Sequence, residues 1–270
     1  MDQRVAQDPR GVPGLISFWT FQEDAGEDRV ASGPYAYRLR EGAGPVRRVA
    51  DGVFGPYAAF VDFGQWLRAP RASCPALDIH GRRGVTVVAW VKRLRKPDQH
   101  DWGEFIAGVW DEYGKRQYAL FLNLGQDSVR PDNVGLDDAG YGHQVNGHVS
   151  DTGGPTPGFE WNRNASFSAA TVPFDRWSCV AMTYDGASVR SYANGACDPR
   201  PRLNPFAFDG GLYDGGADGA DFYVGADPVP GYGIANCYRG LLGGLAVYNR
   251  ALGDDELATL AGFIDSPGAP

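Results

Sequence analysis

The chain has few of the residues that build metal and redox sites: four cysteines, four histidines and two methionines among 270 residues. No Cys-x-x-Cys pair or zinc-type Cys/His spacing occurs, which argues against a structural zinc site. No apolar run is long enough for a transmembrane helix, so membrane insertion is not expected. The net charge of −8 argues against nucleic acid as a partner, although a local basic patch could still accept an acidic glycan.

The first residues, MDQRVAQDPRG, are polar and lack the apolar segment of a signal peptide. As read, the chain is expected in the cytoplasm unless a leader was removed, and its compartment is otherwise unknown. Cys179 falls inside an expected strand and should be a buried, reduced thiol. Cys197 and Cys237 fall in expected loops and could pair, and parity alone leaves both outcomes open.

The abundant residues are 38 glycines and 19 prolines, which favour many turns and little helix. Residues 174–195 form the central segment of the pattern. Residues 177–184 are apolar at nearly every position, which is typical of a strand covered on both faces. Asp-Gly at 185–186 and Asn-Gly at 194–195 favour tight turns, so the segment predicts consecutive antiparallel strands in a layered β fold.

This segment resembles the laminin-G-like/concanavalin A-like lectin/glucanase jelly-roll superfamily in its Trp, its Thr-Tyr-Asp-Gly and its Tyr-x-Asn-Gly. Three other stretches are also similar to that superfamily: residues 14–21 (GLISFWTF), 85–92 (VTVVAWVK) and 243–257 (GGLAVYNRALGDDEL). The resemblance implies an all-β, two-sheet antiparallel sandwich with a short C-terminal helix and with its first and last strands adjacent. It does not select among lectins, binding modules, glycosidases and lyases.

We therefore expect one jelly-roll domain over 14–262, after an N-terminal arm (1–13) and before a C-terminal tail (263–270). Residues 57–67 alternate as a strand, and 104–110 and 117–124 predict a hairpin with a charged tip. Residues 126–173 form an unusually long, polar connection, with short strands expected near 134–136 and 147–149. A loop of that length in a compact domain is usually functional or disordered.

Sugar recognition needs aromatic plates together with polar groups that satisfy hydroxyls. Residues of these types gather at the hairpin tip and in the long connection, and they predict a carbohydrate or glycoconjugate site on the concave sheet face. The candidate ligand-binding residues are Trp102, Trp110, Asp111, Tyr113, Trp161, Arg163 and Asn164. We expect Trp161 to be the stacking platform.

The alternative function is glycan cleavage by a lyase or a glycoside hydrolase. The catalytic candidates are then His143, His148, Tyr141 and Glu160, because proton transfer needs a His or Tyr base or a carboxylic acid. The Glu-x-Asp-x-x-Glu strand of the laminarinase-like branch and the Arg-rich and Gln-Ile-His strands of the alginate-lyase branch are absent. A domain that only binds protein is a further alternative.

Calcium is a possible cofactor. Asp209, Asp214, Asp218 and Asp221 lie in one Gly/Asp-rich loop and offer oxygen ligands, although a plain acidic loop has the same composition. The acidic loop at 23–28 follows the first strand, where related domains place calcium or carboxylates that fix the backbone. A site made of His143, His148 and Asp151 lacks helical i, i+4 spacing.

Overall fold

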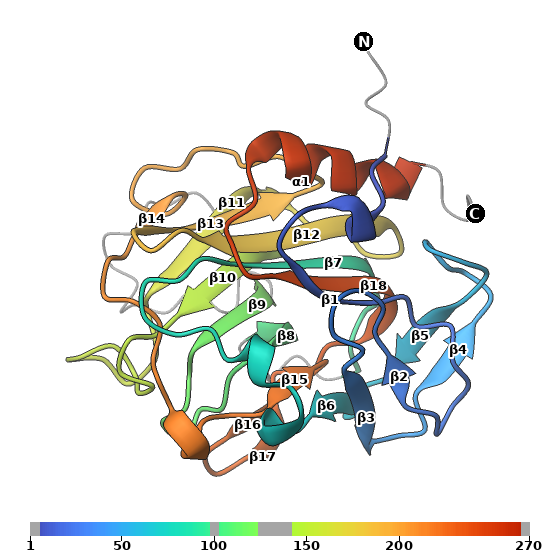
Figure 1. Cartoon of the computed structure of the whole chain (residues 1–270), viewed down its shortest axis with the longest axis horizontal. Coiled ribbons are helices and arrows are strands. Elements are labelled where there is room, and N and C mark those ends of the chain that lie inside the picture. Colours follow the sequence, from blue (N-terminus) through green and yellow to red (C-terminus); the bar gives the residue numbers. More distant parts are fainter. Residues whose placement is uncertain (1–5, 98–102, 124–141, 266–270) are drawn as a thin grey trace.

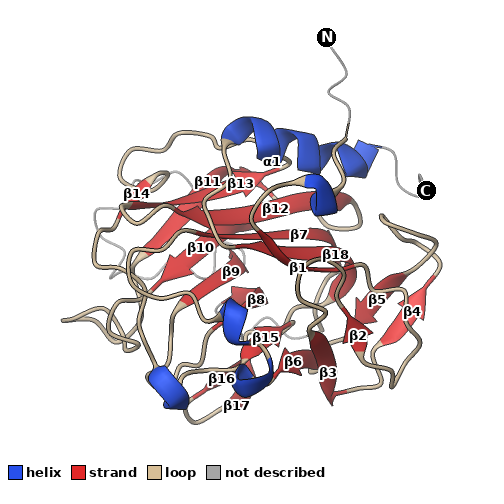
Figure 2. Ribbon diagram, viewed as in Figure 1, coloured by secondary structure: helices blue, strands red, loops and turns tan. Residues whose placement is uncertain are grey.

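The computed structural model describes residues 6–97, 103–123 and 142–265. Within these ranges the chain forms two eight-stranded antiparallel sheets, a two-stranded ribbon and one α-helix. Figure 1 shows the sheets as two layers, with α1 (Asp254–Ala261) above the first sheet. Strands outweigh helices throughout the molecule (Figure 2). The predicted two-sheet β sandwich with a short C-terminal helix is confirmed.

The first sheet has the strand order β14-β13-β12-β7-β18-β5-β4, and β1 also pairs with β18. Leu15 lies opposite Tyr248, so the first and last strands are adjacent, as the resemblance implies. The strands are β1 (Leu15–Trp19), β4 (Arg47–Val49), β5 (Ala58–Val61), β7 (Val85–Arg93), β12 (Trp177–Tyr184), β13 (Ser188–Ala193), β14 (Phe206–Ala207) and β18 (Gly240–Tyr248).

The second sheet has the strand order β11-β10-β9-β8-β15-β6-β3-β2. Its strands are β2 (Arg29–Val30), β3 (Arg38–Ala43), β6 (Trp66–Ala69), β8 (Gly103–Val109), β9 (Tyr118–Asn123), β10 (Gln144–Val149), β11 (Ala165–Thr171) and β15 (Phe222–Val224). The separate ribbon pairs β16 (Asp227–Val229) with β17 (Gly233–Ala235).

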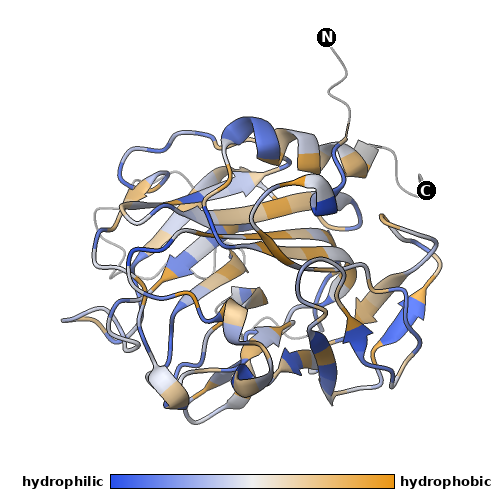
Figure 3. Cartoon of the chain, viewed as in Figure 1, coloured by the Kyte–Doolittle hydropathy of each residue, from blue (hydrophilic) through white to orange (hydrophobic). Residues whose placement is uncertain are grey.

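The main hydrophobic core lies between the two sheets, and side chains such as Val180 of β12 and Leu120 of β9 are fully buried in it. A second cluster covers the outer face of the first sheet, where Trp90 packs with Leu257 and Leu260 of α1. Figure 3 shows hydrophobic segments on the central strands and hydrophilic ones on the peripheral strands β3 and β4. The helix therefore closes one side of the sandwich.

Strand β12 lies between β7 and β13, and all of its residues except the first are buried. Gly186 has φ of 91° in the following turn, where the Asp185 carboxylate accepts two backbone N–H groups. Asn194 and Gly195 also have positive φ, at 52° and 78°. The predicted strand, turn and return strand are confirmed.

The single strand predicted over 57–67 is wrong, because β5 and β6 belong to different sheets. Between them the Gln65 side chain accepts the N–H of Asp62 at 3.0 Å, and Gly64 has φ of 83°. This turn carries the chain from the first sheet to the second. Alternation of apolar and polar residues does not reveal such a crossing, because both strands keep the same period.

The range 126–173 is not simply a loop, because it contains β10 and β11 as an antiparallel pair at the edge of the second sheet. The strand expected near 147–149 is confirmed, whereas 134–136 lie outside the described residues. β11 reads ASFSAAT and has no β-branched apolar residue, so its strand signal is weak. Its Ser166 hydroxyl instead lies 2.6 Å from that of Ser191 in β13.

Helix α1 begins after Gly253, whose N–H is accepted by the Glu256 carboxylate at 3.0 Å, as half of a capping box predicts. The expected N-terminal arm is attached, because the Tyr248 hydroxyl donates to the Pro9 carbonyl at 3.1 Å.

Among the described residues, no helix has the length and hydropathy to cross a membrane. Short 3-10 helices are η1 (Pro9–Gly11), η2 (Arg71–Ser73), η3 (Pro75–Leu77), η6 (Gly216–Asp218) and η7 (Gly262–Asp265).

All four cysteines lie in the described ranges, and none forms a disulfide. Cys197 and Cys237 therefore do not make the bridge that their positions allowed. Cys179 is 2% exposed, and burial raises the pKa of its thiol, as expected for a residue inside a central strand.

Candidate ligand-binding face

The outer face of the second sheet carries a row of six residues, one from each of six neighbouring strands. Residues directly opposite on neighbouring antiparallel strands point to the same side. Ala119 and Tyr223 lie outside the main core, whereas their chain neighbours Leu120 and Val224 are inside it, which identifies the outer side. In order from β10 to β3 the row is His148, Ala119, Gly108, Tyr223, Arg68 and Arg40. These strands follow one another in Figure 1.

Aromatic rings surround this row. Phe105 and Phe121 meet edge to face with centroids 5.0 Å apart, and Trp66 lies 5.7 Å from Tyr223. Trp110 completes the cluster at 6.0 Å from Phe121. The face is therefore apolar in its middle and carries arginines on its β3–β6 side.

Trp110 is poorly placed for the ligand-binding role predicted from the sequence, because only 1% of it is accessible. Its ring packs against Phe121 and His148, and the Arg116 guanidinium lies 5.9 Å from its centroid. The residue therefore supports the face and presents little surface of its own.

His148 lies at the end of the row, with its ring 5.6 Å from Trp110 and 4.9 Å from Phe121. Burial, together with the positive charge of Arg116, lowers the pKa of His148 to about 3. The imidazole is therefore neutral near pH 7, and with so low a pKa it is a weak base for the proton transfer that the catalytic hypothesis assigns to it.

His143 is placed apart from His148, beyond the other end of β10. Its Nδ1 lies 2.7 Å from Nη1 of Arg93, and burial and the charges of Arg93 and Arg95 lower the pKa of His143. Arg93 also forms an ion pair with Glu104, and both side chains are fully buried. The Glu104 carboxylate is therefore part of a buried ion pair in the protein interior.

Three segments meet at one end of this face: residues 110–117, 150–164 and 225–239. The Glu112 N–H donates to the Pro228 carbonyl at 2.9 Å, and the Arg116 N–H donates to the Gly153 carbonyl at 3.0 Å. These contacts bring together segments that are far apart in the sequence. Two of them, 110–117 and 150–164, hold predicted ligand residues.

Asp227 is a buried residue of this junction that the sequence reading missed. It is fully buried, its Oδ1 accepts from Asn236 at 2.9 Å, and its Oδ2 has no hydrogen-bond partner among the described residues. Burial, reinforced by the negative charge of Glu112, raises the pKa of Asp227 well above the usual range. Arg116 bridges to Glu112 at 3.3 Å, while its Nε and Nη1 lack partners within the same ranges.

The predicted residues of the 150–164 segment line its outer turn. Asn164 is fixed to the sheet, because its carbonyl accepts the Val149 N–H at 3.0 Å. The Arg163 guanidinium lies 4.2 Å from the centroid of Phe159, which is 46% exposed. Trp161 is half-buried and Glu160 is exposed, so both reach the surface.

At the neighbouring hairpin tip, Tyr113 is 55% exposed, and its N–H donates to the Asp111 carboxylate at 2.8 Å. Burial raises the pKa of Asp111. The candidates Trp102 and Tyr141 lie outside the described residues.

The four aspartates of the Gly/Asp-rich loop do not converge. Asp209 lies 3.7 Å from Arg82, and Asp221 pairs with Arg68 at 3.1 Å. Among the described residues, one cluster of potential metal ligands occurs, and Asp218 is not part of it. Only Asp214 takes part in that group, with Asp78 and His80.

The group of Asp78, His80 and Asp214 does not fit calcium. Calcium takes six to eight oxygen ligands, whereas this group offers two carboxylates and an imidazole. Asp78 is also occupied, because it pairs with Arg71 and accepts from Gln117 at 2.8 Å.

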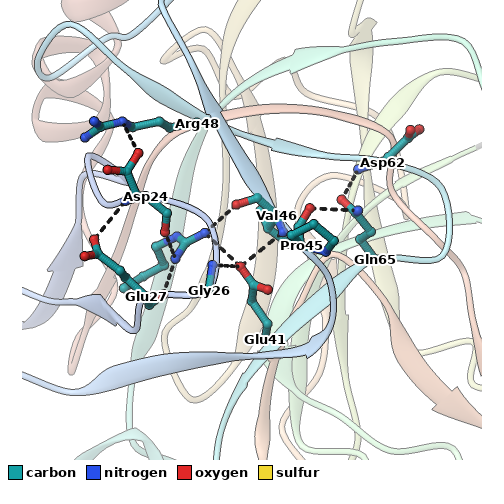
Figure 4. A network of polar contacts seen from close by, with 10 residues as sticks. Asp24, Gly26, Glu27, Glu41, Pro45, Val46, Arg48, Asp62 and Gln65 are labelled. Carbon is teal, nitrogen blue, oxygen red and sulfur yellow. Dashed lines mark hydrogen bonds and ion pairs between the residues drawn. The ribbon is translucent and has the colours of Figure 1, made fainter.

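The acidic loop after β1 is held by a network of polar contacts that includes Asp24, Glu27, Glu41 and Val46 (Figure 4). Arg29 is 1% exposed and donates to the carbonyls of Asp24, Glu27 and Val46 and to the Glu41 carboxylate. Glu41 in turn accepts the N–H groups of Gly26 and Val46. Within the loop the Glu27 carboxylate accepts the Asp24 N–H, and the Glu23 carboxylate accepts the Val30 N–H. These carboxylates fix the backbone, which is one of the two roles expected for this loop.

Comparison with known proteins supports this assignment of the fold. No curated protein matches the chain in sequence. A solved relative is domain 4 of the arabinanase AbnA from Geobacillus stearothermophilus, in complex with arabinotriose. It has a TM-score of 0.54 and 16% identity, over 92% of this chain and 98% of that one.

Two longer proteins also contain this fold. Trypanosoma rangeli sialidase matches with a TM-score of 0.55 and 17% identity over 97% of this chain, which spans 34% of the sialidase. A structure of botulinum neurotoxin type C, whose cell entry depends on two ganglioside molecules, matches with a TM-score of 0.55 and 8% identity. The match covers 93% of this chain and 51% of that one. A family model matches residues 69–258, and the chain therefore belongs to the concanavalin A-like lectin/glucanases superfamily.

Proposed function

We propose that this protein binds a carbohydrate or glycoconjugate on the outer face of its second sheet. The observation that carries the proposal is the meeting of three segments at one end of that face, where Tyr113, Phe159 and Trp161 reach the surface. Aromatic rings provide flat apolar contacts for a sugar ring, and Arg163 and Asp111 beside them offer hydrogen bonds. Membership of a superfamily of lectins and glucanases is consistent with this role.

The test is a glycan array that also scores released product, probed with the intact chain and with Trp161→Ala and Tyr113→Ala. Both variants should lose most of their glycan binding, while their melting temperatures stay within a few degrees of the parent. Tyr35→Ala is the matched control, because Tyr35 is 47% exposed but lies away from this junction. Its backbone N–H donates to the Ile16 carbonyl of β1, in the first sheet. Unfolding of Trp161→Ala, with binding retained by whatever remains folded, would show that Trp161 is a packing residue.

Glycan cleavage is the second candidate function. The gathering of Asp111, Glu112 and Asp227 at the same junction favours it, because glycosidases use one protonated and one ionised carboxyl group. Product release that disappears in Glu112→Gln would support cleavage. Binding without any released product would leave the protein a lectin-like module.

A further inference from the structure

Arg40 of β3 lies directly opposite Arg68 of β6 on the candidate face. Both side chains are exposed, Arg40 to 65% and Arg68 to 47%. Like charges in directly opposite positions destabilise a pair of strands. Sheet stability therefore does not account for this placement.

The neighbouring carboxylates neutralise the charges of these two arginines only in part. Asp28 lies 3.6 Å from both Arg38 and Arg40, which is beyond hydrogen-bonding distance for either. Asp221 contacts Arg68 at 3.1 Å, and its other oxygen accepts the Arg71 N–H. Exposed ion pairs of this length contribute little to stability, so the Arg40 guanidinium remains free to meet an anion.

Trp66 lies on the same side as Arg68, two residues earlier in β6, and its ring rests on Gly42 of β3. A Cβ added to Gly42 would come within 2.3 Å of three atoms of the six-membered ring. The glycine thus lets the indole lie face-down on the sheet. The ring is half-buried and presents an apolar plate beside the two arginines.

Tyr223 connects this corner to the rest of the row. It lies opposite Arg68, and its ring centroid is 5.7 Å from that of Trp66. Burial is the main cause that raises the pKa of Tyr223 to about 12, so its hydroxyl stays protonated beside Arg68.

We infer that this corner is a subsite for an acidic sugar, in which Arg40 and Arg68 bind a carboxylate or sulfate group and Trp66 stacks on the sugar ring. Guanidinium groups bind such anions through paired, charge-assisted hydrogen bonds. The inference rests on the proposed carbohydrate binding and adds the class of glycan. Two neighbouring arginines form a local positive patch, so the net charge of −8 does not prevent binding of an anion there.

The test uses an array that prints neutral glycans beside their uronic, sialylated and sulfated counterparts. We expect binding to the acidic members only, with affinity that falls as salt rises. Arg40→Gln and Arg68→Gln should each weaken it by about tenfold or more, since a hydrogen bond to a charged group contributes about 1.5–3 kcal/mol. Their melting temperatures should be unchanged or higher, because opposed like charges are removed. Arg82→Gln is the matched control, at 70% exposure and 3.7 Å from its aspartate.

A second variant, Gly42→Ala, displaces the Trp66 ring without removing it and should also abolish acidic-glycan binding. Gly11→Ala is its control, because an added Cβ there has its nearest neighbour at 3.8 Å. Equal binding of neutral and acidic glycans, unaffected by the arginine variants, would overturn the subsite and leave the proposed function standing. Binding to no glycan would overturn both. A lower melting temperature in both arginine variants, with glycan selectivity unchanged, would show a structural role instead.

Discussion

Arg29 donates from Nη2 to the Glu41 carboxylate at 3.1 Å and to the Val46 carbonyl at 2.6 Å, and this guanidinium acts as the internal cation of the loop after β1. Three backbone carbonyls and a carboxylate form the kind of oxygen-rich environment that a hard metal ion would use. Because Arg29 already fills it, this loop has no need of calcium.

Arg29→Met should lower the free energy of unfolding by about 3–5 kcal/mol, as expected when one partner of a buried ion pair is removed. Urea unfolding measures the change. Arg10→Met is the control, because Arg10 is 57% exposed in its pair with Asp8 and should shift the midpoint little. A small effect in Arg29→Met would mean that the loop is held by other contacts.

Chelation should leave the melting temperature of the parent protein unchanged, since neither acidic loop presents an open oxygen cage. Thermal scans with millimolar calcium and with chelator provide the measurement. A calcium-dependent rise in melting temperature would instead show a bound ion, because ligand binding to the native state adds RT ln(1+[L]/Kd) to stability.

The pKa of about 3 for His148 predicts a pH dependence of stability. Below about pH 6.5 an unfolded histidine takes up a proton while the folded one does not, so stability falls as pH decreases towards 3. The loss is about 1.4 kcal/mol per pH unit in this window. His148→Gln should therefore show a flatter decline, whatever its absolute stability.

The buried Arg93–Glu104 pair predicts a large loss in Arg93→Met, again about 3–5 kcal/mol, because Glu104 would be left charged and unpaired in the core. Chemical denaturation of Arg190→Met, whose ion pair with Asp185 is one-third exposed, gives the comparison and should show no more than about 1 kcal/mol. Similar losses in both variants would refute this ranking.

Cys179 should resist a thiol reagent in the native protein, because it is buried and its thiol has a raised pKa. Cys197 is only half-buried and should be modified first. Mass spectrometry of partly labelled protein would identify the modified sites. Rapid modification of Cys179 under native conditions would contradict its place inside β12.

The central strands could be predicted from the sequence because their signals are local. Trp177 to Tyr184 is apolar throughout, and Asp185-Gly186 marks its end. By contrast, β11 could not be predicted, because a strand whose residues are alanine, serine and threonine apart from Phe167 gains its stability from neighbours such as Ser191. A crossing between sheets, as at Gly64, depends on turn geometry that the alternation does not encode.

The candidate site was partly predictable. Residue type suggested Tyr113, Trp161 and Arg163 as ligand residues, and their role in binding stays a prediction. The hairpin that carries Tyr113 was predicted from the two strands on either side of it. The register of the six strands could not be predicted from the sequence. The pairing of Arg40 with Arg68 could therefore not be predicted either. Trp110 was a candidate ligand-binding residue by its type, whereas packing against His148 encloses it.

The pairing of β1 with β18 leaves the two ends of the fold close together, and the Gln7 N–H donates to the Thr259 carbonyl at 3.3 Å. Both ends lie with α1 on the outer side of the first sheet, while the proposed face belongs to the second. A tag, a solid support or a neighbouring module joined at either end would thus leave the proposed glycan-binding face pointing outwards. The same proximity makes the fold suitable for circular permutation, with new ends opened in an exposed loop of the first sheet.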